Sequence, residues 1–208
     1  MDPTGLYEWA ATCASGDEQC EQNRQRFRDA LTTVRTAAEQ YQEGSEERVK
    51  LEGILAKYGK EGKKNRVFIS FGDAGGSPAQ ESTSVLGKFV LFGARARTIT
   101  FDLGVIDKSI ENRNDDSKPS IEFAGLVAHE GSHLFDKNLF GNPVSYAGSL
   151  NTERTAFSAQ SLVNKGLNAL SEWGLWNPSW AEADRDKLRQ AGVEHEAKRD
   201  ADRIWGKK

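Results

Sequence analysis

Apolar residues recur at spacings of three and four along much of the chain, which is the period of an amphipathic helix. This pattern predicts one helix from Asp17 to about Gln42 and another from Ser45 to about Tyr58. A buried helix is expected to begin at Pro119, because proline is favoured in the first helical turn. The charged tail from Ala181 to Trp205 also predicts helix, with one or two breaks such as Gly192.

Between these helices, short runs of β-branched and aromatic residues bounded by glycines predict strands. We expect three of them, at Val67–Phe71, Lys88–Phe92 and Thr98–Leu103. The segment Gly72–Pro78 fits no phosphate-binding pattern and predicts a turn or the rim of a cleft. The polar stretch Ile106–Ser117 lacks the ligand spacing of a calcium loop and predicts a surface loop. The chain is therefore predicted to be an α+β protein with a small antiparallel or mixed sheet.

The length of 208 residues suits one domain, or a domain with an appended arm. We expect residues 7–64 to form a helical N-terminal region that packs on a main body formed by residues 65–208. The 28 basic and 31 acidic residues are interleaved and leave a net charge of −3. This balance favours neither nucleic acid nor an anionic membrane surface, and no apolar run is long enough to span a bilayer.

The strongest chemical signal lies inside the helix expected from Pro119. His129 and His133 flank Glu130 in a His-Glu-x-x-His pattern, which takes two of the chain's three histidines. Residues four apart lie above one another on a helix face, so both imidazoles can reach one divalent cation. Glu130 is offset by one position and can instead take a proton from a water on that cation, as a general base. The pattern predicts a zinc hydrolase site, in which zinc lowers the pKa of the water toward roughly 7.

A catalytic zinc usually takes three protein ligands, so a further side chain must complete the set. Glu153 lies twenty positions past His133, early in a second helical pattern and after a turn-rich connection from Asn138 to Leu150. Asp136 competes for this role, but on the histidine helix it would project away from the two imidazoles. His195 would require the charged tail to fold over the cleft, at a cost in buried charge. We therefore expect Glu153 to be the third ligand.

Two aromatic features have roles that the sequence leaves open. Tyr146 lies in the expected connection between the two ligand helices, and its phenol could donate a hydrogen bond to the oxyanion formed during hydrolysis. It is a candidate catalytic residue, with packing as the alternative. Trp173, Trp176 and Trp180 follow the Glu153 helix and either cap a core or line a substrate pocket.

His129, Glu130, His133 and a glutamate at the distance of Glu153 resemble the gluzincin pattern of thermolysin-like metallopeptidases. The resemblance implies a zincin-like fold, in which a small sheet lies beside the active-site helix. It also implies an edge strand that holds an extended peptide by strand addition. Thr98–Leu103 is our candidate for this strand, and an ordinary place in the sheet core is the equal alternative.

The chain departs from the thermolysin-like pattern behind the histidines. Where that pattern has an acidic supporting residue, this chain has Phe157 and Ser158, so no partner is assigned to the histidine rings. The resemblance implies hydrolysis of peptide bonds and names no substrate. A metal-dependent amidase acting on cell-wall peptides is one alternative, and a non-catalytic helical binding module is another.

The segment Asp2-Pro3-Thr4-Gly5-Leu6 resembles the DPxGL signature that closes the core of Rhs and related YD-repeat proteins. In that family the segment after the signature is a toxin, released by cleavage next to it. The resemblance implies that residues 1–6 are a remnant of this motif and that the rest is a type VI secretion effector used in interbacterial competition. It implies three partners: the Rhs core with its secretion apparatus, a cognate immunity protein, and a peptide substrate in the target cell's cytoplasm or periplasm. An ordinary turn is the alternative.

The two cysteines, Cys13 and Cys20, are close together near the N-terminus. A small disulfide loop is the favoured interpretation if the protein works outside a reducing cytoplasm, and two free thiols are the alternative. No further cysteine or nearby histidine completes a zinc ligand set, so zinc is least expected there.

Overall fold

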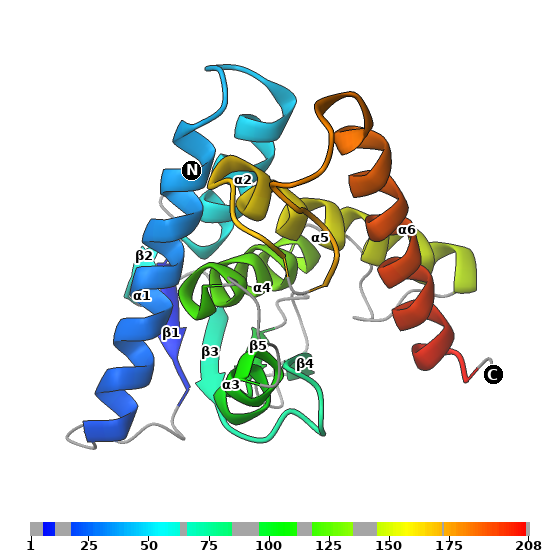
Figure 1. Ribbon diagram of the computed structural model, residues 1–208. Helices are drawn as coiled ribbons and strands as arrows, with labels where there is room; N and C mark the ends of the chain where they lie inside the picture. The colour runs from blue at the N-terminus through cyan, green and yellow to red at the C-terminus, as the bar shows by residue number, and fades with distance from the viewer. Residues whose placement is uncertain are drawn as a thin grey trace.

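The structure, a computed structural model, describes residues 6–10, 18–62, 66–84, 96–111, 118–134, 145–171 and 173–206. Its helices are α1 (Glu18–Glu39), α2 (Glu46–Tyr58), α3 (Leu103–Glu111), α4 (Pro119–His133), α5 (Tyr146–Gly166) and α6 (Arg185–Ile204), with the 3-10 turn η1 (Glu182–Asp184) before α6. Its strands are β1 (Leu6–Trp9), β2 (Lys60–Glu61), β3 (Val67–Phe71), β4 (Ala79–Ser84) and β5 (Ala96–Phe101). Figure 1 shows α4 in the middle of the molecule, with α1 on one side and α6 on the other. The predicted α+β class is confirmed.

The described strands form one mixed sheet in the order β2-β1-β3-β5-β4. β1 runs parallel to β2 and β3, and β3 runs parallel to β5. β4 pairs antiparallel with β5, with Ala79 opposite Phe101. Of the two alternatives for Thr98–Leu103, the place inside the sheet is confirmed and the edge strand is wrong, because β5 lies between β3 and β4. Among the described strands, β4 forms this edge of the sheet. Ile99 and Phe101 of β5 are fully buried, as expected for a strand inside a sheet.

The structure confirms two of the three predicted strands and does not describe the third. β3 coincides with the strand predicted at Val67–Phe71, and β5 overlaps the one predicted at Thr98–Leu103. The strand predicted at Lys88–Phe92 lies outside the described residues. The sheet also takes β1 and β2 from the N-terminal region that was expected to be helical, so this region contributes strands as well as α1 and α2.

The two N-terminal helices are confirmed. α1 buries a stripe of apolar side chains at helical spacing, including Phe27, Leu31 and Val34. α2 begins after Ser45, whose hydroxyl oxygen accepts a hydrogen bond from the Arg48 amide at 3.3 Å. Both helices pack against α4 as well as against each other.

The prediction of a surface loop from Ile106 is wrong for its first part, because α3 extends from Leu103 to Glu111. The Asp102 side chain accepts a hydrogen bond from the Val105 amide at 3.0 Å and so helps to start this helix. Leu103 and Ile106 then turn toward the core and are 9% and 4% exposed. The polar and acidic residues of this stretch led to the prediction of a loop, although the short apolar face of α3 packs against the core.

The C-terminal half also differs in two respects from the prediction. The turn-rich connection expected to reach Leu150 ends earlier, because Ser145 caps α5 by accepting a hydrogen bond from the Gly148 amide at 3.1 Å. α6 runs unbroken through Gly192, where a break was predicted. A Cβ built on Gly192 would lie 2.5 Å from the Gly174 carbonyl oxygen, so the glycine serves close packing instead.

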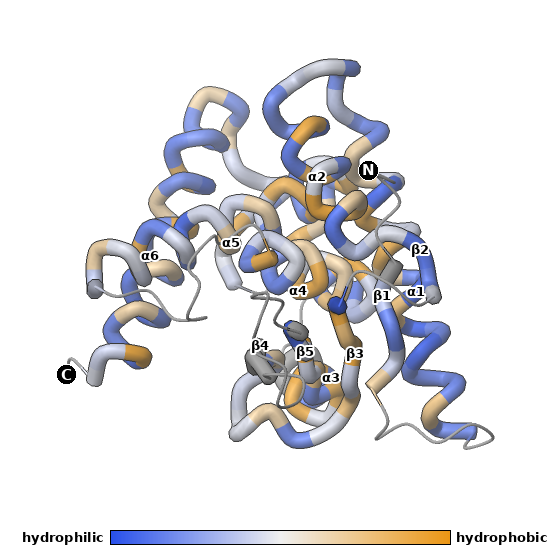
Figure 2. Tube along the Cα trace, turned by 180° about the vertical axis from the view of Figure 1, so that it is seen from behind, coloured by the Kyte–Doolittle hydropathy of each residue, from blue (hydrophilic) through white to orange (hydrophobic). Residues whose placement is uncertain are grey.

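One hydrophobic core joins α1, α2, α4, α5 and the sheet, and a smaller cluster around Phe157 and Leu175 lies between α5 and α6. Figure 2 shows hydrophobic residues concentrated in α4 and β3, whereas α6 is mainly hydrophilic. None of the described helices is long and apolar enough to cross a membrane. Cys20 is buried and disulfide-bonded, in line with the favoured interpretation, while Cys13 lies outside the described residues.

Candidate metal centre

α4 carries the predicted site and is buried along most of its length. His129 is 5% exposed and Glu130 is 7% exposed. Two glycines let this helix approach its neighbours closely: a Cβ on Gly131 would lie 2.5 Å from the Tyr58 ring, and one on Gly125 would lie 3.0 Å from Gln160 Cγ. α4 is therefore held tightly between α2 and α5, which fixes the helix face that bears the histidines.

α5 runs antiparallel to α4, with one contact at each helical turn. Glu122 at the start of α4 meets Asn164 near the end of α5, and Gly125 meets Gln160. The next turn brings the His129 ring edge to face against Phe157, with ring centroids 4.4 Å apart. Contacts of both histidines with Glu153 complete this register. The buried face of α5 that lies against α4 consists of Glu153, Phe157, Gln160 and Asn164.

The structure brings the three predicted metal ligands together. Oε2 of Glu153 lies 3.5 Å from Nε2 of His129 and 3.7 Å from Nε2 of His133. The three ligand atoms all lie within 4.8 Å of one another. Two imidazoles and a carboxylate at these separations could hold a metal ion.

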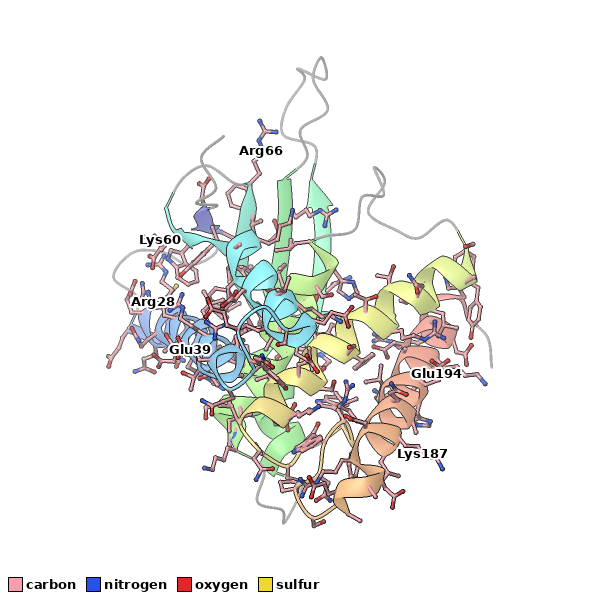
Figure 3. All side chains as sticks on the ribbon, turned by 90° about the horizontal axis from the view of Figure 1, so that it is seen from above. Arg28, Glu39, Lys60, Arg66, Lys187 and Glu194 are labelled. Carbon is pink, nitrogen blue, oxygen red and sulfur yellow. The ribbon has the colours of Figure 1, made fainter. Side chains whose placement is uncertain are left out.

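Of the two competing ligands, the structure describes His195, which is not part of this group. His195 is on the outer side of α6, where its side chain is 77% exposed and lies 3.8 Å from Glu196. Figure 3 shows its neighbour Glu194, together with Lys187, along the solvent side of this helix. The solvent-exposed position expected for His195 is confirmed, whereas Asp136 lies outside the described residues.

Electrostatics distinguish the two glutamates of the site. Burial acts to raise the pKa of Glu153, but a hydrogen bond from His129 and the charges of His133 and His129 outweigh it and lower the pKa. Burial raises the pKa of the Glu130 carboxyl, and the two histidines only partly oppose this shift. Glu153 is thus the better anionic ligand, while Glu130 is the carboxyl more inclined to hold a proton.

A cavity of about 600 Å³ opens in front of the three ligands. Glu130 faces it from α4, and Gln160 and Phe157 face it from α5. The glycine-rich segment before β4 forms part of its wall, which confirms the prediction of a cleft rim. Trp173 also lines it, so one tryptophan of the aromatic turn takes the pocket role, while Trp176 is buried.

Three arginines that sequence reasoning did not single out also line this cavity. Arg97 of β5 donates a hydrogen bond to the His133 carbonyl oxygen at 2.7 Å, which ties the sheet to the C-terminal end of α4. Arg203 of α6 donates to the Ser77 hydroxyl at 2.6 Å and so links α6 to the rim across the cavity. Arg199 stacks over the Trp173 ring at 5.4 Å. These contacts join residues far apart in sequence, so no local sequence pattern could have predicted them.

Tyr146 begins α5 and does not lie among the residues that line the cavity. Its hydroxyl donates a hydrogen bond to the Asp202 carboxylate at 2.8 Å, which connects α5 to α6. A role in oxyanion binding stays a prediction, and it would require the hydroxyl to leave Asp202.

Comparison with known proteins assigns no family and no function to this site. No protein-family model, no curated protein and no solved structure matches the chain. The function must therefore be argued from the site itself.

Proposed function

We propose that this protein is a zinc-dependent peptidase with a zincin-like arrangement of sheet and active-site helix. The observation that carries the proposal is the meeting of His129, His133 and Glu153 at one end of a cavity that Glu130 also faces. Zinc–ligand bonds of about 2.0 to 2.2 Å in a tetrahedron place ligand atoms about 3.3 to 3.6 Å apart. The 3.5 Å separation of Glu153 from His129 falls within that range, and the 3.7 Å separation from His133 slightly exceeds it.

Zinc bound by these three residues would supply a Lewis acid that polarises a water molecule and the carbonyl of the substrate. Glu130 is the base of the reaction, because it faces the same cavity and is not one of the three converging ligands. Its carboxylate takes the proton from the water and passes it to the nitrogen of the departing amine.

The edge of the sheet suits an extended peptide. β4 pairs with β5 on one side, and no described strand pairs with its other side. Pro78, Ala79 and Gln80, at the start of β4, line the same cavity as the three ligands. A peptide added to this edge would lay its backbone past the metal centre. The strand that binds substrate in this proposal is therefore β4, in place of the predicted Thr98–Leu103 strand.

We further propose that the hydrolysis serves as a toxin activity against a target bacterial cell. Support for this step comes from the resemblance of Asp2-Pro3-Thr4-Gly5-Leu6 to the DPxGL signature, and residues 1–5 lie outside the described residues. The proposal includes delivery with an Rhs core and protection of the producing cell by an immunity protein that covers the cavity.

The substitution Glu130→Gln tests the enzymatic proposal, because it removes the base and keeps all three ligands. Hydrolysis of a mixture of unstructured peptides by the zinc-loaded chain should fall by about 10²- to 10⁴-fold, with zinc content unchanged. The exposed Glu182 provides the matched control, since Glu182→Gln should leave hydrolysis intact. Equal hydrolysis by the parent and Glu130→Gln chains would overturn the mechanism.

Expression in the cytoplasm and in the periplasm of a bacterial host tests the toxin step separately. The parent chain should inhibit growth in at least one compartment, and Glu130→Gln should not. A zinc-loaded parent chain that cleaves peptides and harms neither compartment would overturn the toxin role alone.

A further inference from the structure

The interface between α4 and α5 contains a row of buried polar groups that ends at His129, one of the three candidate ligands. Asn164 Nδ2 donates a hydrogen bond to Glu122 Oε1 at 3.1 Å. One turn back along α5 lies Gln160, which is 1% exposed and packs its Cγ over Gly125. His129 is one turn beyond Gly125 on α4. The row therefore leads from Glu122 through Asn164 and Gln160 to His129 at the metal centre.

The side chains of Asn164, Gln160 and His129 each have one buried atom with no hydrogen-bond partner in the part of the chain that the structure describes: Asn164 Oδ1, Gln160 Nε2 and His129 Nδ1. Leaving a buried polar atom unpaired is costly, so three in one row require an explanation. The first is an acceptor and the second is a donor. The third is a ring nitrogen that carries a proton whenever Nε2 of the same ring binds a metal.

We propose that Gln160 is a positioning residue that completes a hydrogen-bonded relay from Glu122 to His129. In the described position of the Gln160 amide neither contact is made. A turn of this amide about its side-chain bonds would let Nε2 donate to Asn164 Oδ1, one turn along the helix, and Oε1 accept from the protonated Nδ1 of His129. Each of the three atoms then has one partner, and the relay reaches Glu122 because Asn164 already donates to it. The relay fixes the ring of His129 so that its Nε2, the atom 3.5 Å from Glu153, faces the cation. This inference rests on the metal site of the proposed function and not on peptide hydrolysis.

The relay passes through Gln160 because Phe157, which contacts His129, cannot accept a hydrogen bond. Phe157 is four residues past Glu153 and its ring packs edge to face on His129, but it has no atom that can accept a hydrogen bond. The next residue along this face of α5 is Gln160, and its amide has both a donor and an acceptor. Outer partners of ligand histidines orient the ring and raise its basicity, so their loss typically weakens metal binding.

The substitutions Gln160→Met and Gln160→Glu test the relay. Methionine keeps the unbranched shape of the side chain without its polar atoms, whereas glutamate keeps an acceptor for His129. Zinc affinity, measured by competition with a chromophoric chelator, should fall by about 10- to 100-fold in Gln160→Met and stay close to that of the parent in Gln160→Glu. Leu162→Met is the packing control: it alters the core side of α5 and should leave zinc affinity unchanged.

Nitrogen-15 NMR of the histidine rings gives a readout that a packing role would not change. In the zinc-loaded parent, the Nδ1 proton of His129 should exchange slowly with water, and Gln160→Met should abolish this protection. Equal zinc affinity in Gln160→Met and the parent, or a rapidly exchanging Nδ1 proton in the zinc-loaded parent, would overturn the relay. The exchange rate of the Nδ1 proton in the zinc-loaded parent tests the relay even if neither Gln160 variant folds. A parent chain that binds no zinc overturns both proposals, whereas one that binds zinc and cleaves no peptide overturns peptide hydrolysis alone.

Discussion

Tyr58 and Gly131 lie in direct contact, and this contact fixes α4, the helix that carries the two histidines, from the side opposite α5. A Cβ on Gly131 would lie 2.5 Å from Cε2 of Tyr58, and the tyrosine hydroxyl donates to the Val127 carbonyl oxygen at 2.9 Å. The end of α2 thus meets α4 beside its histidines. The N-terminal helices are part of the support of the site and not a detached arm.

Gly131→Ala should destabilise the protein by about 1 to 3 kcal/mol, because the added methyl group has to displace the buried Tyr58 and Ile54 side chains. Urea unfolding of the metal-free chain measures this cost. Gly104→Ala in α3 is the control, since its Cβ would meet its nearest neighbour, Asp102 Oδ1, at an ordinary 3.4 Å. Equal stability of Gly131→Ala and the parent would show that α2 and α4 are less tightly packed than described.

The three candidate metal ligands could be picked out from sequence because their geometry is mostly local. His129 and His133 are one helical turn apart, so their convergence needs only that α4 be a helix. Glu153 needed one further assumption, a second helix packed across the first after a turn-rich connection. The structure meets the part of this assumption that concerns the helices, with α5 packed antiparallel to α4.

The features that sequence reasoning missed depend on long-range contacts or on polar sequences. β4 has the sequence Ala-Gln-Glu-Ser-Thr-Ser, which lacks the apolar alternation that identifies a strand. The bond between Arg203 and Ser77 joins residues 126 positions apart. Gln160 looks like an ordinary helical glutamine until the register of α5 against α4 places it behind His129.

Loss of an outer partner of a ligand typically weakens zinc binding by about 10- to 100-fold. Glu153→Ala should weaken it by about a further order of magnitude, because it removes a direct ligand. His195→Ala should leave zinc affinity unchanged, since that side chain is 77% exposed on the outer side of α6. Zinc titration of both variants makes the comparison. The reverse order of affinities would show that the ligand set is wrong, even if hydrolysis is confirmed.

Lys50 on α2 gives a pH-dependent prediction away from the site. Burial, helped by the charge of Arg189 and opposed by Glu46, lowers the pKa of Lys50 from 10.5 to about 8. Between these pH values the unfolded chain holds a proton that the folded chain has released, so this group makes stability rise with pH across that window. Below about pH 8 the lysine is charged in both states and its burial cost is fully present.

Lys50→Met should therefore stabilise the folded state at pH 7 by about 1 to 2 kcal/mol, after allowance for solvent screening. The gain should shrink as the pH rises from about 8 toward 10.5. Urea unfolding at several pH values, with Lys187→Met on the solvent side of α6 as the control, measures the difference. A gain that is the same at pH 7 and pH 10.5 would contradict the proposed burial of charge.

Elemental analysis of the purified chain tests the central claim most directly. After incubation with excess zinc and removal of the unbound metal, the parent should retain one zinc ion per chain. His129→Ala, which removes one of the three converging ligands, should retain far less. A parent chain with no zinc above background, or a stoichiometry that His129→Ala leaves unchanged, would contradict the assignment of His129, His133 and Glu153 as the metal centre.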